Sequence, residues 1–216
     1  MSFRLGITGA ATAMALWGIV SPASAAIIIH NAPGPVQPSE NVLLDSGPTG
    51  STIFGTTNKQ STKVSFQSLA DGVKLNAASN GQAGVEAVGG PLDTLRFFLT
   101  DGQGFGQVEF ALHKAEGTTG NVTVTFFGTF AGGQTSQTFR LGNGNSWFSA
   151  ETTDGDMITA VAFDTDGVGV GDLRQVRLGG IAPAAAPVPE PASWAMMLGG
   201  FALLGAATRR KKVAFA

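Results

Sequence analysis

The feature that most constrains the fold is a two-residue alternation of apolar and polar side chains that recurs between residues 26 and 180. Leu95, Phe97 and Leu99, for example, share one side of such a segment. This period is typical of a β-strand with one buried face. We therefore expect an all-β domain over 26–180, built as a single β-sandwich of the jelly-roll type. The clearest segments are 62–66, 95–99, 108–112 and 122–126, and the turn pairs between segments include Asp71-Gly72, Asn80-Gly81, Asp101-Gly102 and Asp154-Gly155.

Composition limits the chemistry of this domain. The chain has no Cys, which excludes disulfides, thiolate metal sites and cysteine nucleophiles. A hydrophobic fraction of 43% with 13% charged residues is enough to bury a core. Between residues 26 and 187 there are eight basic and fourteen acidic residues, a net charge of −6. Because such a domain repels phosphate backbones, nucleic acid is not an expected partner.

The first 25 residues have the three parts of a secretory signal peptide. A single arginine supplies the charged start, and residues 5–20 form a small and apolar stretch. Ala23 and Ala25 place small side chains where signal peptidase requires them, which predicts cleavage before Ala26. An uncleaved N-terminal helix is the alternative. It is disfavoured because the apolar stretch is short for a membrane span.

The other end of the chain predicts a membrane anchor. Residues 181–188 form an Ala/Pro linker, since repeated proline forbids helix. An apolar helix, which we expect to be transmembrane, follows over 192–207, with Trp194 at one membrane interface. The basic cluster 209–212 lies at the other interface and predicts a cytoplasmic C-terminus.

The motifs of this end resemble the PEP-CTERM sorting tail in its PEPxxWA form. The resemblance covers 189–212 and implies a Gram-negative host, processing by an exosortase and an association with exopolysaccharide genes. The tail is also known as an ice-binding protein C-terminal motif, a name that implies no ice binding here. Segments 81–95 and 171–180 resemble parts of uncharacterised PEP-CTERM ectodomains, which implies no activity. The residues that carry the tail resemblance include Pro189, Glu190, Pro191, Trp194, Arg209 and Arg210.

Two patterns in the domain suggest ligands. Five aspartates crowd its C-terminal part, and carboxylate oxygens at close spacing suit calcium. The alternative is ordinary turn chemistry, in which Asp precedes Gly. The sequence therefore leaves a structural calcium ion as a hypothesis and predicts no other cofactor. The aspartates are Asp154, Asp156, Asp164, Asp166 and Asp172.

The second pattern surrounds Trp147, the ectodomain's only tryptophan. An exposed indole stacks on sugar rings, and Asn143 and Asn145 offer hydrogen bonds beside it. The alternative is a core anchor, because aromatic side chains dominate cores. Phe98 and Phe127 fall on the polar sides of their segments, which indicates either a second packed layer or an exposed apolar patch.

No pattern predicts catalysis. The two histidines, His30 and His113, have no motif partner for a metal, and no serine nucleophile elbow occurs. We expect a non-catalytic protein of the envelope or extracellular matrix that associates with exopolysaccharide. A purely structural surface protein and a secreted glycan hydrolase are the alternatives. The tail predicts an inner-membrane precursor that later reaches the cell surface or matrix.

Overall fold

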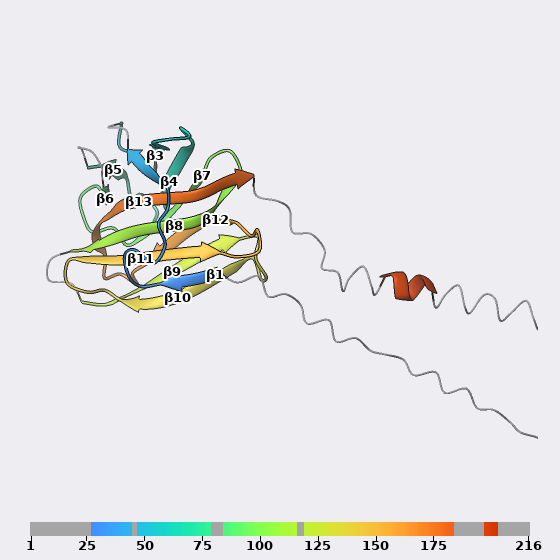
Figure 1. Ribbon diagram of the computed structural model, residues 1–216. Helices are drawn as coiled ribbons and strands as arrows, with labels where there is room; N and C mark the ends of the chain where they lie inside the picture. Colours follow the sequence, from blue (N-terminus) through green and yellow to red (C-terminus); the bar gives the residue numbers. More distant parts are fainter. Residues whose placement is uncertain (1–26, 45–46, 79–83, 116–118, 184–196, 203–216) are drawn as a thin grey trace, which may run out of the picture. The chain divides into compact units, whose positions relative to one another are not determined.

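The computed structural model describes residues 27–44, 47–78, 84–115, 119–183 and 197–202 (Figure 1). They fall into a β domain and a short helix at 197–202, which are considered separately. The described β domain contains thirteen strands, so the expectation of an all-β domain is confirmed. The strands are β1 (Ile27–His30), β2 (Glu40–Leu44), β3 (Thr52–Thr57), β4 (Lys63–Ser68), β5 (Leu75–Ala77), β6 (Val85–Ala87), β7 (Thr94–Leu99), β8 (Gln103–Lys114), β9 (Asn121–Gly128), β10 (Gln134–Arg140), β11 (Asn145–Thr152), β12 (Ile158–Asp164) and β13 (Val170–Pro183).

Seven of these strands close a barrel. Hydrogen-bonded neighbours run from β8 through β12, β7, β4, β3, β2 and β13 back to β8. The pairs β1–β11, β9–β10 and β5–β6 extend this ring beside β8, β12 and β13. The pairing therefore differs from two separate sheets of a jelly roll, because two short contacts join the broad parts. These contacts are β2–β13, through two residue pairs, and β8–β12, through one.

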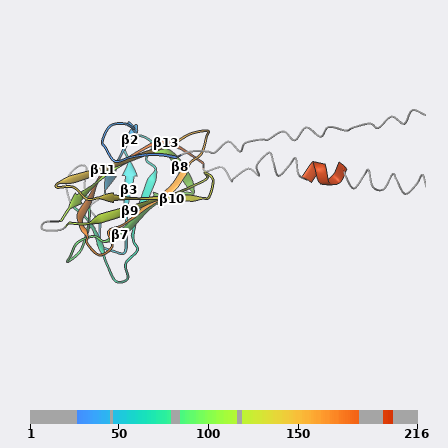
Figure 2. The same cartoon turned by 90° about the horizontal axis from the view of Figure 1, so that it is seen from below.

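Two broad faces result, on opposite sides of one core. We call the outward side of β11, β8 and β13 the first face, and the outward side of β3, β4, β7, β12 and β9 the second face. Seen from below, β11, β13 and β8 lie toward one side of the domain, and β9, β10 and β7 lie toward the other (Figure 2).

A chain of phenylalanine rings fills the space between the two faces. The ring of Phe97 on β7 meets that of Phe110 on β8 edge-on, with centroids 5.5 Å apart. Phe66 extends the contact on one side, and Phe148 and Phe139 extend it on the other. All five side chains are buried. Since the inward side chains of β7 and β8 meet here, the outward side chains of these strands point away from each other.

The short contact between β8 and β12 depends on a glycine. Phe105 of β8 pairs with Ile158 of β12. At the preceding position, Gly104, a β-carbon would lie 2.7 Å from Cβ of Met157 and 3.0 Å from the carbonyl oxygen of Ile158. Only a residue without a side chain allows the two strands to approach this closely, so Gly104 permits the barrel to close at this corner.

Strand β13 is longer than the sequence predicted. The linker was expected at 181–188, but β13 continues to Pro183. Ile181 pairs with Phe105, and Pro183 with Gln103. This corrects the start of the linker by three residues. A proline is tolerated there because it ends the strand, where a missing N–H costs no hydrogen bond inside the sheet.

The helix at 197–202 is the described part of the expected transmembrane segment 192–207. Its large apolar side chains, Met197, Leu198 and Phe201, are exposed. Among the residues that the structure describes, no helix has the length and apolar character needed to span a membrane. The remainder of 192–207 lies outside the described residues.

Candidate functional site

The outward side chains of β11, β8 and β13 line up in rows across the first face. Antiparallel pairing sets Trp147 beside Ala111, and Ala111 beside Arg174. One row further along, Asn145, His113 and Asp172 are neighbours in the same way. On the other side of the Trp147 row, the neighbours are Ser149, Glu109 and Arg177.

The row that contains Glu109 is covered. We call residues 31–38, between β1 and β2, the strap. The amide of Gly34 in the strap donates a hydrogen bond of 2.9 Å to Oε2 of Glu109. The hydroxyl of Ser149 donates to the carbonyl oxygen of Ala32, also in the strap, at 3.3 Å. Glu109 and Ser149 are consequently buried, although both point away from the core.

Arginine 177 completes this buried polar cluster. Its Nη1 lies 3.2 Å from Oε1 of Glu109, and its Nε donates to Oδ1 of Asn41 at 3.0 Å. Arg177 therefore joins the Glu109 carboxylate to strand β2, beside the short contact that closes the barrel. The cluster satisfies the hydrogen-bonding needs of a buried carboxylate, which would otherwise be costly.

The row that contains Trp147 lies beyond the strap. Trp147 is half-buried and Asn145 is exposed, while Ala111 between Trp147 and Arg174 is fully buried. The predicted residues Asn145 and Trp147 thus share the outward side of β11. Asn143, in the turn before β11, is also exposed, and its Oδ1 accepts a hydrogen bond of 3.3 Å from Nζ of Lys114. The structure therefore gathers the three predicted residues at one end of β11.

An ion pair borders this open part of the face. The guanidinium of Arg174 contacts both carboxylate oxygens of Asp172 at 2.5 Å. The hydrogen bond to Asp172 raises the pKa of Arg174 above its usual value. A raised pKa keeps Arg174 charged, and its contribution to stability would be lost only as the pH rises through that pKa. Sequence reasoning missed both this pair and the Glu109–Arg177 pair. The one sequence signal was the pair of arginines near the end of the domain.

The five aspartates do not form the calcium cluster that the sequence suggested. Asp154 and Asp156 lie in the turn before β12, whereas Asp164 and Asp166 lie at the far end of that strand. Within the described ranges, no group of three or more acidic or histidine side chains is arranged to hold a metal ion. Asp172 is the partner of an arginine rather than a member of this group.

The contacts of these aspartates are those of turn residues. Oδ1 of Asp164 accepts a hydrogen bond of 2.8 Å from the amide of Asp166. Oδ1 of Asp156 accepts one of 3.0 Å from the hydroxyl of Thr129. Asp154 and Asp166 have positive φ angles of 58° and 53°, which Asp tolerates in turns. The alternative interpretation of the pattern as turn chemistry therefore agrees with the geometry.

Comparison with known proteins identifies the C-terminal region. Residues 187–211 match the family model of the PEP-CTERM protein-sorting motif. No curated protein and no solved structure matches the chain. The matched range contains every predicted sorting residue: Pro189, Glu190, Pro191, Trp194, Arg209 and Arg210. These residues, like the cleavage residues Ala23, Ala25 and Ala26, lie outside the residues that the structure describes.

Proposed function

We propose that this chain, an exported protein with an exosortase-type sorting motif, is a non-catalytic component of the cell envelope or extracellular matrix that binds exopolysaccharide. The observation that carries the proposal is the placement of Trp147 and Asn145 on one outward side of β11, next to Asn143. A half-buried indole is held in place by its neighbours and still offers surface to a ligand.

The chemistry of this group suits a neutral sugar. The indole ring packs against the C–H groups of a pyranose, and the two side-chain amides can both donate and accept hydrogen bonds to hydroxyl groups. One stacked ring and a few exposed hydrogen bonds give little free energy, so we expect dissociation constants on the order of millimolar to high micromolar.

The ends of the chain give the proposed route. We propose that signal peptidase cleaves after Ala25 and that the tail then holds the precursor in the inner membrane of a Gram-negative cell. An exosortase-type enzyme would process the tail and release the domain to the surface or matrix. Replacement of the basic cluster 209–212 by neutral residues should weaken membrane retention, because these charges resist translocation. If the neutral variant fractionates like the wild type, the anchoring role is wrong.

The binding proposal is tested with the exported chain and the polysaccharide of its own host. Wild-type protein should co-sediment with the polymer, Trp147→Ala should lose most of the binding, and Trp147→Phe, which keeps a ring, should recover part of it. Melting temperatures of the three proteins control for folding. No binding by wild-type protein would favour the purely structural alternative. Reducing ends that accumulate with time would instead identify a glycan hydrolase.

A further inference from the structure

The second face carries a row of phenylalanines that the first face lacks. The pairing register sets Phe54 of β3 beside Ser65 of β4, and Ser65 beside Phe98 of β7. The row continues from Phe98 to Ala160 of β12 and then to Phe127 of β9. We call Phe54, Phe98 and Phe127 the aromatic row. These side chains lie on the outward side of their strands, whereas the phenylalanines of the core lie on the inward side.

The rings of the aromatic row are evenly spaced, and small side chains lie between them. One strand separates each ring from the next, so neighbouring rings are about 10 Å apart across the sheet. Ser65 and Ala160, which occupy the intervening strands, are small and buried. Phe54 is 42% exposed, and Phe98 and Phe127 are half-buried. This arrangement suits a long, extended polymer in which every second unit contacts a phenylalanine ring.

Two cations accompany the rings. Cζ of Arg96 lies 5.4 Å from the centroid of Phe98 and 5.1 Å from that of Phe127. Nζ of Lys63 lies 3.8 Å from the centroid of Phe54. Among the described residues, neither cation has a carboxylate partner, and Nε of Arg96 is buried without a hydrogen bond. Each ring of the row thus lies against a cation that has no anionic partner among the described residues.

The surroundings of the row differ in charge from the domain as a whole. Two neighbouring rows of outward side chains carry this difference: the row that contains the three rings and the row that contains Arg96. Neither row includes an Asp or a Glu, although the domain carries a net charge of −6. Arg96 is the charged residue of these two rows, and Lys63 lies in the adjoining row on the other side of Phe54, opposite Thr56. An anionic ligand therefore meets complementary charge at these rows, although the net charge of the domain is negative. The residues of the two rows are Phe54, Ser65, Phe98, Ala160, Phe127, Gln134, Thr52, Gln67, Arg96, Ala162, Thr125 and Ser136.

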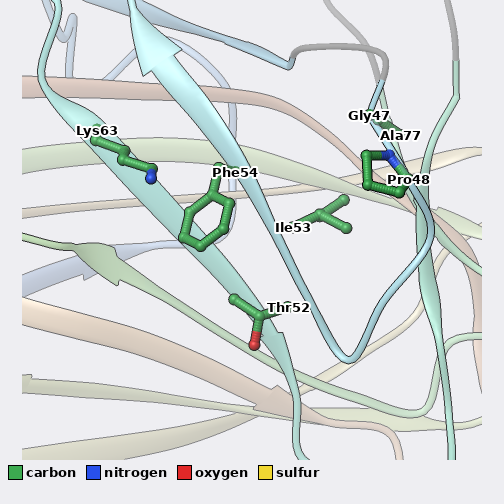
Figure 3. A pocket seen from close by; sticks show the side chains of 7 residues that line it. All are labelled: Gly47, Pro48, Thr52, Ile53, Phe54, Lys63 and Ala77. Atoms are coloured by element: carbon green, nitrogen blue, oxygen red, sulfur yellow. The ribbon is translucent and has the colours of Figure 1, made fainter.

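A pocket lies at the Phe54 end of the row. Its volume is about 300 Å³, and strand β3 lies at its centre. Phe54 and Lys63 lie together on one side of β3, and Ile53 points from the other side toward Pro48 and Ala77 (Figure 3). Gly47 and Thr52 complete the described lining. The row therefore begins at a pocket lined by the ring of Phe54 and the ammonium group of Lys63, and it continues across β4, β7, β12 and β9.

We infer that the second face binds an extended anionic polysaccharide, a chain of sugars that carry carboxylates. Such a polymer matches both the rings and the cations of this face. Its pyranose C–H groups can pack on the phenylalanine rings, and its carboxylates can pair with Lys63 and Arg96. The inference stands apart from the Trp147 site, since the rings of Phe97 and Phe110 pack between the two faces. A second copy of this chain, joined through the same face, is a poorer occupant, because the two rows of one copy offer no carboxylate to the Lys63 and Arg96 of the other.

Polygalacturonic acid and its methyl ester make a matched pair of probes, since they share a backbone and differ in charge. The exported chain should bind the acid at low salt and bind the ester at least about tenfold more weakly, because loss of charge removes the ionic contacts. Lys63→Gln, an exposed position, should weaken binding to the acid about threefold to tenfold, and Phe54→Ala should do the same. Arg140→Gln, an exposed cation on β10 that pairs with Asn121 at the opposite end of β9 from Phe127, is the control and should bind like the wild type.

Three outcomes would overturn this inference. Equal binding to the acid and the ester would show that the protein does not recognise the carboxylates of the polymer. Unchanged binding by the double variant Lys63→Gln/Phe54→Ala, with an unchanged melting temperature, would place the polymer elsewhere. A concentration-dependent dimer that Phe54→Ala abolishes, in the absence of any polymer binding, would make the row an interface between copies of the chain. Failure of the Trp147 proposal alone would leave the result with polygalacturonic acid intact.

Discussion

On the first face the strap buries a row of outward side chains, whereas on the second face the aromatic row stays open. The buried row contains a carboxylate, Glu109, with a full set of hydrogen-bond partners. The open row consists of rings, and the two cations that contact them have no carboxylate partners in the described structure. Polar groups that are satisfied internally serve stability, and polar groups that are left unsatisfied at a surface are available to a ligand. The difference therefore separates a covered row on the first face, which stabilises the fold beside the proposed Trp147 site, from an open row on the second face, which is free to bind.

The largest effect is expected where the two faces join. Gly104→Val places a branched side chain against Met157 and the backbone of Ile158, so it should lower the free energy of unfolding by about 3 kcal/mol. Urea denaturation measures this change. Gly90→Ala, where a β-carbon meets no atom within 4 Å, is the control and should shift stability by no more than about 0.5 kcal/mol. Equal stability of both variants would show that the corner is not closely packed.

Removal of the buried carboxylate should have the next largest effect. Glu109→Ala leaves the amide of Gly34 and the guanidinium of Arg177 without their partner, at an expected cost of about 2 kcal/mol. The cost is moderate because the Arg177 side chain is 41% exposed and can turn toward water. Glu151→Gln, on the same face but half-buried, is the matched control. Hydrogen exchange should show the strap opening in Glu109→Ala and staying protected in Glu151→Gln.

A smaller loss of stability is expected when Arg177, in the same buried cluster, keeps its charge but loses its hydrogen-bond geometry. Arg177→Lys keeps the positive charge near Glu109 but loses the bond from Nε to Asn41, which should cost about 1 kcal/mol. Thermal unfolding would detect it as a lower melting temperature. If Arg177→Lys is as unstable as Glu109→Ala, the link to β2, rather than the neutralised carboxylate, holds the strap in place.

The smallest effect is expected on the second face. Thr125 and Ser136 share a hydrogen bond of 2.8 Å between their hydroxyl groups, with Ser136 exposed and Thr125 half-buried. Thr125→Val keeps the β-branched shape, so it should change stability by no more than about 0.5 kcal/mol. Calorimetry on this variant beside Glu109→Ala compares the two faces directly. A cost near that of Glu109→Ala would contradict the contrast between a stabilising covered row on the first face and an open row on the second.

Local pattern was enough to predict β4, β7, β8 and β9 and the buried sides of these strands. Leu95, Phe97 and Leu99 are buried as the alternation required, and Asn145 and Trp147 fall on the same outward side because they are two residues apart on a strand. The aspartates showed the limit of such reasoning. Their closeness in sequence suggested a metal site, but a seven-residue strand separates the two pairs in space.

The sequence by itself determined the all-β character of the domain and the sorting motif, because strand periodicity and a short linear motif are both local properties of the chain. Only the tertiary structure decided which side chains meet. Glu109, Gly34 and Arg177 are distant in sequence, and Phe54, Phe98 and Phe127 come from three strands whose order no local pattern encodes. Strand order depends on which hydrophobic sides bury one another across the whole core, and this choice is made by packing over long distances along the chain. Phe98 and Phe127 drew attention as single anomalies in the sequence, and they became a row only when β4, β7, β12 and β9 were placed side by side.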